Sequence, residues 1–299
     1  MIADRVGKVT DQIIMMGSKE SCVYLLMGDD EYALLGGGMI NIIPDVISML
    51  QELDIDEKKI TQMLILHSHF DHCGIIPYFK KRWPHAEIAA SFRAKDLLKK
   101  QKVIAGIDFM NQICLQNYDM DRLPDDMPSK FSGIEVEKPL KEGDSLSVGG
   151  LSMEIIETPG HSSCSIAVYV PEIKALFASD AGGIPIGNNI FTAASSNFDK
   201  YEQSLYRMKN FDIDIFLAEH YGGCTGDDAK TFIPRSIKSA RKTRQILEES
   251  LSRTKDVKKS TEEITDKFYK NLPENFMPRD VISFIVSQML NWLHKQKQI

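Results

Sequence analysis

One short segment concentrates side chains that bind metal ions. LHSHFDHCG, at 66–74, carries three histidines and one aspartate in the spacing H-x-H-x-D-H. Histidine is scarce in this chain, with seven residues, so four potential ligands within six positions form a specific signal. Neutral imidazole and carboxylate groups are ligands that Zn²⁺ and similar borderline ions favour. One ion cannot easily use four groups from so short a loop, whereas two adjacent ions can; the candidates are His67, His69, Asp71 and His72.

Three more candidate ligands follow predicted strands later in the chain. They are His161 in TPGHSSCS, Asp180 in LFASDAGG and His220 in LAEHYGG, each with glycine close by. Glycine lets the backbone turn sharply and approach a ligand closely. A lone histidine is more often a core residue, but five of seven histidines in glycine-bearing loops after strands favour a common site. We interpret the remaining two, His85 and His294, as surface residues.

The elements that must position these side chains alternate along most of the chain. Apolar runs between polar turns predict three strands within 12–36, and apolar residues at intervals of three and four predict a helix at 42–53. A further helix is predicted at 104–120. From about residue 227 the pattern is only helical. We therefore divide the chain into a mixed unit, 1–226, and a helical C-terminal cover, 227–299.

Composition restricts the possible partners. The chain has 299 residues and a formal net charge of -6, which argues against nucleic acid as the main ligand because phosphate binding needs clustered Lys and Arg. No apolar run is long enough for a membrane span, and the N-terminus lacks a secretory pattern. Five scattered cysteines without CxxC spacing predict reduced, mostly buried thiols. We expect a cytoplasmic protein with a small-molecule substrate.

Taken in order, HSHFDH, TPGHS, SDAGG and EHYGG resemble the motif set of the metallo-β-lactamase superfamily. The resemblance covers about residues 12–225 and implies an α/β fold, the αββα four-layer sandwich, here with a helical C-terminal extension. It implies that 1–226 is the catalytic domain and that two divalent transition metal ions are bound, Zn or Fe, with Mn possible. It assigns one ion to His67, His69 and His161, the other to Asp71, His72 and His220, and the bridging position to Asp180.

This ligand set predicts a binuclear metal-dependent hydrolase. Two ions about 3.5–4 Å apart share a bridging water and lower its pKa towards about 7, which gives a metal-bridging hydroxide at neutral pH. The candidate catalytic residues are Asp71 and Asp180; either Asp71 or a metal-bound water is the proton donor to the leaving group. Cys73 is interpreted as a small buried residue. Glu219 is either a group behind the ligands or a solvated charge.

In overall layout the chain is also similar to the subgroup of the quinolone-signal response protein, a thioesterase of bacterial quorum sensing. The similarity rests on HSHFDHCG followed by IIPYF, and on a terminal helix entered through NFMPRD. It implies hydrolysis of a thioester or carboxylic ester. Two alternatives stay open: a phosphodiesterase of the same fold, and a signalling effector whose hydrolysis is incidental. The basic run ARKTR, at 240–244, is interpreted as a charged helical face rather than a glutathione site.

The last segment predicts an amphipathic helix that starts after Pro278. At 100° per residue one apolar stripe contains Val281, Ile282, Ile285, Val286, Met289, Leu290 and Leu293. Phe284 lies outside this stripe, and an exposed aromatic side chain calls for a pocket, a partner or an oligomer contact. Our hypothesis is that the tail covers the metal cleft, and that Phe276, Met277 and Phe284 line a substrate pocket or the seam of a homodimer.

Overall fold

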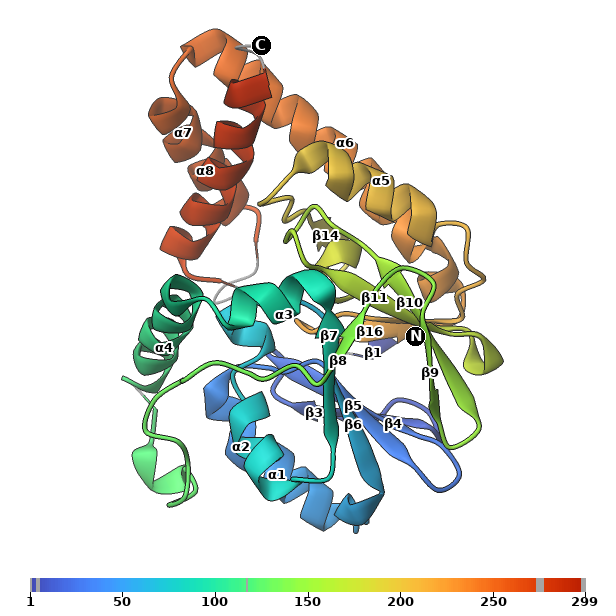
Figure 1. The fold of residues 1–299 in the computed structure, drawn as a ribbon. Helices are drawn as coiled ribbons and strands as arrows, with labels where there is room; N and C mark the ends of the chain where they lie inside the picture. Colours follow the sequence, from blue (N-terminus) through green and yellow to red (C-terminus); the bar gives the residue numbers. More distant parts are fainter. Residues whose placement is uncertain (1, 4–5, 117, 273–276, 297–299) are drawn as a thin grey trace.

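The computed structural model describes residues 2–3, 6–116, 118–272 and 277–296. Its centre is a pair of seven-stranded sheets, with helices outside both (Figure 1). The first sheet has the order β2-β3-β4-β5-β6-β7-β8, and its pairs from β5 to β8 are parallel. Its strands are β2 (Gly7–Lys8), β3 (Ile13–Gly17), β4 (Cys22–Met27), β5 (Tyr32–Leu35), β6 (Ile60–Ile65), β7 (Glu87–Ser91) and β8 (Lys138–Leu140).

The second sheet is built mainly from the later part of the chain. Its order is β1-β16-β15-β12-β11-β10-β9, and among the strand pairs of the described residues in this sheet only β12–β15 is parallel. Its strands are β1 (Ile2–Ala3), β9 (Ser145–Val148), β10 (Leu151–Glu157), β11 (Ile166–Val170), β12 (Ala175–Phe177), β15 (Ile215–Leu217) and β16 (Gly223–Thr225). A separate hairpin joins β13 (Ile184–Ile186) to β14 (Asn189–Phe191).

Strand β3 shows why the sequences of the central strands are continuous apolar runs. Ile13 and Met15 belong to the core between the two sheets, while Ile14 and Met16 belong to the core under the helices. Successive side chains of a strand point to opposite faces, so a strand buried on both faces is apolar throughout. This double burial produces the four layers, helix–sheet–sheet–helix, and the predicted αββα sandwich is confirmed.

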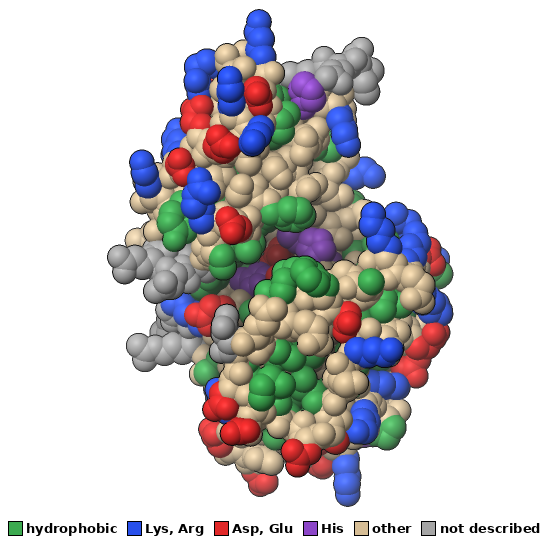
Figure 2. All heavy atoms as spheres, turned by 90° about the vertical axis from the view of Figure 1, so that its left-hand side faces the viewer, with side chains coloured by type: hydrophobic (Ala, Val, Ile, Leu, Met, Phe, Trp, Pro, Cys, Tyr) green, Lys and Arg blue, Asp and Glu red, His purple; other side chains and the backbone are tan. Residues whose placement is uncertain are grey.

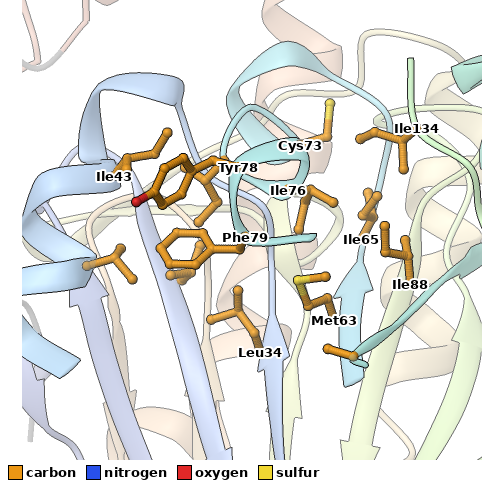
Figure 3. Close-up of a cluster of buried hydrophobic side chains, with 14 of the residues drawn as sticks. Leu34, Ile43, Met63, Ile65, Cys73, Ile76, Tyr78, Phe79, Ile88 and Ile134 are labelled. Atoms are coloured by element: carbon orange, nitrogen blue, oxygen red, sulfur yellow. The ribbon is translucent and has the colours of Figure 1, made fainter. Parts of the chain in front are cut away.

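The described residues of the first half of the chain form four α-helices. They are α1 (Ile43–Glu52), α2 (Ile76–Arg82), α3 (Phe92–Leu98) and α4 (Gln101–Leu115). Figure 3 shows how Ile43, Ile76 and Phe79 meet the side chains of Leu34, Met63 and other sheet residues in one buried cluster. The predicted helix at 42–53 is confirmed. The one predicted at 104–120 begins three residues earlier and ends at Leu115, because the side chain of Asp119 instead caps a short 3₁₀ turn at Met120–Arg122.

The later α-helices in the described part of the chain are α5 (Phe198–Met208), α6 (Asp227–Thr254), α7 (Val257–Tyr269) and α8 (Arg279–Gln296). One side chain, Arg244 of α6, joins three of them. Its guanidinium lies 2.7 Å from carboxylates of Asp199 and Glu202 on α5, and 5.8 Å from the ring centre of Trp292 on α8. Arg244, part of the basic run at 240–244, therefore holds helices together.

Helix α8 begins at Arg279, directly after Pro278 as predicted. Ile282, Val286, Met289, Leu290 and Leu293 are buried, and Ile285 is partly buried. The sequence predicts Val281 in the buried apolar stripe, but the structure leaves its side chain 39% exposed, so this prediction is wrong. The line of contact along α8 runs through Ile282, and Val281 lies 100° away around the helix, outside that line.

Candidate metal centre

The segment 66–74 leaves the end of β6 and is held by backbone contacts to its neighbours. The carbonyl of Leu66 accepts a hydrogen bond from the amide of Ile166 at 2.9 Å, which ties the segment to the second sheet. The thiol of Cys73 donates to the carbonyl of His69 at 3.1 Å. Cys73 is fully buried, as the sequence predicts. At the other end the amide of Gly74 donates to the carbonyl of Gly38 at 2.8 Å, so the loop is fixed at both ends without a metal ion.

Helix α5 holds the loop that carries His161. The Ser204 hydroxyl donates to the carbonyl of Pro159 at 2.8 Å. Gly160 has a φ of 138°, and a Cβ there would lie 2.3 Å from the backbone of Tyr201. Only glycine permits this close approach, which explains the glycine that precedes the histidine.

Three ring nitrogens converge from two of the motifs. Nε2 of His67 lies 3.1 Å from Nδ1 of His69 and 3.2 Å from Nε2 of His161, and the third edge of the triangle measures 3.0 Å. Nitrogens bound tetrahedrally to one Zn²⁺ at 2.0–2.1 Å would lie roughly 3.4 Å apart. This triangle is therefore close to the size that a single ion requires.

A second group adjoins the first. Nε2 of His220 lies 3.0 Å from Nε2 of His72 and 3.4 Å from Oδ2 of Asp71. The distance from Nε2 of His72 to Oδ2 of Asp71 is 3.7 Å. Three donor atoms of the types that bind borderline ions are thus gathered again.

Asp180 stands between the two groups. Its Oδ2 lies 3.3 Å from Nε2 of His161 in the first group and 3.3 Å from Nε2 of His72 in the second. Its Oδ1 is buried and has no hydrogen-bond partner among the described residues. A buried carboxylate oxygen without a partner is costly, and a cation would satisfy it. The residues present therefore fit a pair of metal ions with a shared carboxylate.

The electrostatics of the first group favour the neutral, metal-binding form of histidine. Burial, with a smaller effect from neighbouring histidines, lowers the pKa of His67 well below its usual value. Burial and His161 lower the pKa of His69 to about 3. The pKa of His161 is also lowered, mainly by burial. These rings present lone pairs at neutral pH, as a metal site requires.

In the second group nearby carboxylates outweigh burial, and the histidine pKa values are raised. Burial opposes charge on His72, but Glu219, Asp180 and Asp71 outweigh it and raise the pKa of His72 well above its usual value. The pKa of His220 is raised against burial as well, chiefly by Asp180. The histidines in turn lower the pKa of Asp180, although burial alone would raise it. In the metal-free protein the second group therefore holds protons that a cation would replace.

In His161 and His220 the ring nitrogen that faces away from the centre has a hydrogen-bond partner that fixes the orientation of the ring. Nδ1 of His161 donates to the carbonyl of Ala193 at 2.7 Å, and Nδ1 of His220 donates to the carbonyl of Glu20 at 2.5 Å. With the proton on Nδ1, the Nε2 lone pair faces the centre. Such orienting partners are typical of histidines that bind metal.

Sequence reasoning left Glu219 open between two roles and did not single out Ser179. The structure buries both, at 1% exposed each. Nδ1 of His72 lies 3.0 Å from Oε2 of Glu219, a charge contact that is not aligned as a hydrogen bond. The Ser179 hydroxyl donates to Glu219 and lies 3.3 Å from Nδ1 of His67. Their positions next to Asp180 and His220 are the only sequence signal that could have marked them.

The seven predicted ligand positions are thus brought together. The three residues predicted to line a pocket do not share one environment. Met277 packs against a small buried cluster that includes Ala193, whose carbonyl accepts a hydrogen bond from His161. Phe284 is 61% exposed. Phe276 lies outside the described residues. Their role in a pocket or a dimer stays a prediction. Of the two histidines predicted at the surface, His85 is exposed and His294 is partly exposed.

The family model of the metallo-beta-lactamase superfamily matches residues 19–220, a span that contains every candidate ligand. The chain belongs to this superfamily. A metallo-beta-lactamase family protein of Thermus thermophilus has a similar fold, with a TM-score of 0.65 at 17% identity, over 98% of this chain and 91% of that one.

Among curated proteins, a hydroxyacylglutathione hydrolase of Rhodopseudomonas palustris (strain BisB5) is 27% identical over 137 residues, which are 46% of this chain and 40% of the relative. An acyl-coenzyme A thioesterase of Gallus gallus is 24% identical over 205 residues, 66% of this chain and 69% of the relative. The match to the first relative thus spans about two fifths of its length. No helix among the described residues is long and apolar enough to cross a membrane.

Proposed function

We propose that this protein is a binuclear metal-dependent hydrolase that cleaves a thioester or a carboxylic ester. The observation that carries the proposal is the position of Asp180, whose Oδ2 lies 3.3 Å from a histidine of each group. A pair of bound ions supplies Lewis acidity and an activated water to such a site. His67, His69 and His161 would hold one ion; Asp71, His72 and His220 the other; Asp180 would be shared.

The cleft indicates where a substrate enters. Figure 2 shows histidine and acidic side chains at the base of a hollow, with hydrophobic side chains above and below it. His69 and Asp71 are the partly exposed members of the two groups, while the other candidate ligands are buried. A carbonyl that enters the hollow therefore meets the centre from the side of His69 and Asp71.

Asp71 is suited to move a proton. Its side chain is 23% exposed, which leaves it open to the cleft. The nearby histidines hold its pKa below the usual value although burial opposes this, so Asp71 is ionised at neutral pH and can hold a proton only transiently. As a carboxylate it accepts a proton from the water whose oxygen bonds to the carbonyl carbon. It then passes that proton to the departing sulfur or oxygen as the ester bond breaks. The hydrolase relatives, one of which is an acyl-coenzyme A thioesterase, support the choice of thioester.

The test is turnover by metal-replete protein on a panel with one generic thioester, one carboxylic ester and one phosphodiester. We expect cleavage of the thioester or carboxylic ester, abolished by chelation and in Asp180→Ala. A preference for the phosphodiester would show that the substrate class is a phosphodiester and not a thioester or carboxylic ester. An absence of metal-dependent turnover on the whole panel would overturn the proposal and favour an effector role.

A further inference from the structure

A buried carboxylate lies behind the centre, contacts a ligand of one half directly and reaches the other half through a serine. Glu219 follows β15 and is 1% exposed. Its Oε2 lies 3.0 Å from Nδ1 of His72 and accepts a hydrogen bond from the Ser179 hydroxyl. Its Oε1 accepts from the amide of Gly37 at 3.3 Å. A carboxylate so deeply buried needs such partners, and two of its three lead towards candidate ligands.

Ser179 extends this connection to the other half. Its Oγ lies 3.3 Å from Nδ1 of His67. Because the hydroxyl proton goes to Glu219, Oγ is free to accept the His67 Nδ1 proton, which leaves the His67 Nε2 lone pair for the centre. The sequence of contacts is therefore His67–Ser179–Glu219–His72, with one histidine from each group at its ends.

The strained backbone conformation of Ser179 indicates that its hydroxyl contributes to the site. Ser179 has a φ of 48°, in the left-handed region that residues other than glycine rarely adopt. Glycine would adopt this conformation without strain, but it has no hydroxyl. A strained residue at a site, held there by its surroundings, points to a role in that site.

Space for the carboxylate is provided by a glycine on a neighbouring strand end. Gly36 follows β5 with a φ of 89°, and a Cβ at this position would lie 2.4 Å from Oε1 of Glu219. Any side chain there would displace the carboxylate. The run GGG at 36–38 thus contributes both the room and, through Gly37, an amide donor.

We infer that Glu219 and Ser179 are positioning residues that orient one ligand of each metal ion, so that the two ions depend on a single buried carboxylate. This inference rests on the proposed metal centre and adds to it a link between the two sites. Loss of an orienting partner behind a metal ligand typically lowers metal affinity 10–100-fold. Here the loss of Ser179 or Glu219 should weaken the binding of both equivalents.

The experiment measures metal binding rather than turnover. Metal-free wild type, Glu219→Gln, Ser179→Ala and Ser179→Gly are titrated with Co²⁺, and the visible spectrum reports affinity and ligand geometry for each equivalent. Ser179→Ala removes the hydroxyl and keeps the strained backbone, whereas Ser179→Gly removes both. Ser68→Ala is the control, because this buried serine contacts Cys164 at 3.2 Å and lies between two ligands without touching Glu219.

We expect Glu219→Gln and both Ser179 variants to bind both equivalents roughly 10–100-fold more weakly with altered spectra, and the control to match wild type. Ser179→Gly should melt close to wild type, which separates positioning from folding. Unchanged affinities in Ser179→Ala and Glu219→Gln overturn the inference, as does a loss confined to one equivalent. Wild type that binds two equivalents but has no turnover contradicts the proposed hydrolysis alone; wild type that binds none contradicts both.

Discussion

Oδ2 of Asp180 lies 3.3 Å from Nε2 of His161, and the same oxygen is equally close to Nε2 of His72. One carboxylate oxygen thus faces both groups of candidate ligands, while the second oxygen of Asp180 is buried without a partner in the described part of the chain. A negative charge shared between two cations reduces their mutual repulsion. This relationship makes the metal content of the protein the first quantity to measure.

Wild-type protein purified with metal supplementation should contain about two equivalents of a divalent transition metal per chain. His69→Ala should lower the content towards one equivalent, because it removes a ligand from the first group only. Asp180→Ala should lower both, because the carboxylate serves both groups. Elemental analysis of the three proteins decides this, and only trace metal in the supplemented wild type would contradict the ligand assignment.

Asp71→Asn should separate metal binding from proton transfer. The amide oxygen can still act as a ligand, but it cannot accept and return a proton at neutral pH. We expect kcat to fall about 10²–10⁴-fold while metal content stays near that of wild type. Asp45→Asn is a matched control, since Asp45 pairs with Arg122 in the exposed part of the molecule. A parallel loss of metal and turnover in Asp71→Asn would mean that Asp71 is only a ligand.

Metal binding should release protons unequally at the two groups. Lowered pKa values keep His67 and His69 neutral at pH 7, whereas the raised pKa values of His72 and His220 favour their protonated forms. The second group must therefore lose protons to bind an ion, and its affinity should rise with pH above the ordinary histidine value of about 6.5, through the raised pKa values of His72 and His220, more steeply than that of the first. Calorimetric titration in buffers of different ionisation enthalpy counts the protons. Equal release for both equivalents would be inconsistent with this asymmetry.

The tail hypothesis is tested by Phe284→Ala. Because Phe284 is 61% exposed, its loss should leave the melting temperature nearly unchanged. A pocket role then predicts a raised Michaelis constant, and a dimer role predicts a lower mass in sedimentation. Leu290→Ala is the comparison, since Leu290 is fully buried and its truncation should cost about 2–5 kcal/mol of unfolding free energy. A Phe284 variant with wild-type kinetics and mass would remove this residue from both roles.

The sequence alone predicted the sandwich and brought forward all seven candidate ligands. The strands and the ligands rest on local signals, whereas the four-layer sandwich was implied by the resemblance of the ordered motifs to the metallo-β-lactamase superfamily. A strand buried on two faces is apolar throughout, as Ile13–Gly17 is, and ligands that follow strand ends stand beside glycines that shape their loops. His161 is an example, because Gly160 before it allows α5 to approach.

The tertiary structure alone decided which side chains contact the ligands from outside the centre, and which face of helix α8 is buried. Ser179 and Glu219 are 40 positions apart, and Gly36 and Glu219 meet across 183, so no local pattern could pair them. Val281 was misplaced because a helical stripe gives a phase around the axis but not where the neighbouring helix stops covering it. Ligand types are properties of single residues and short spacings, whereas burial and charge contacts depend on distant segments that meet only when the chain folds.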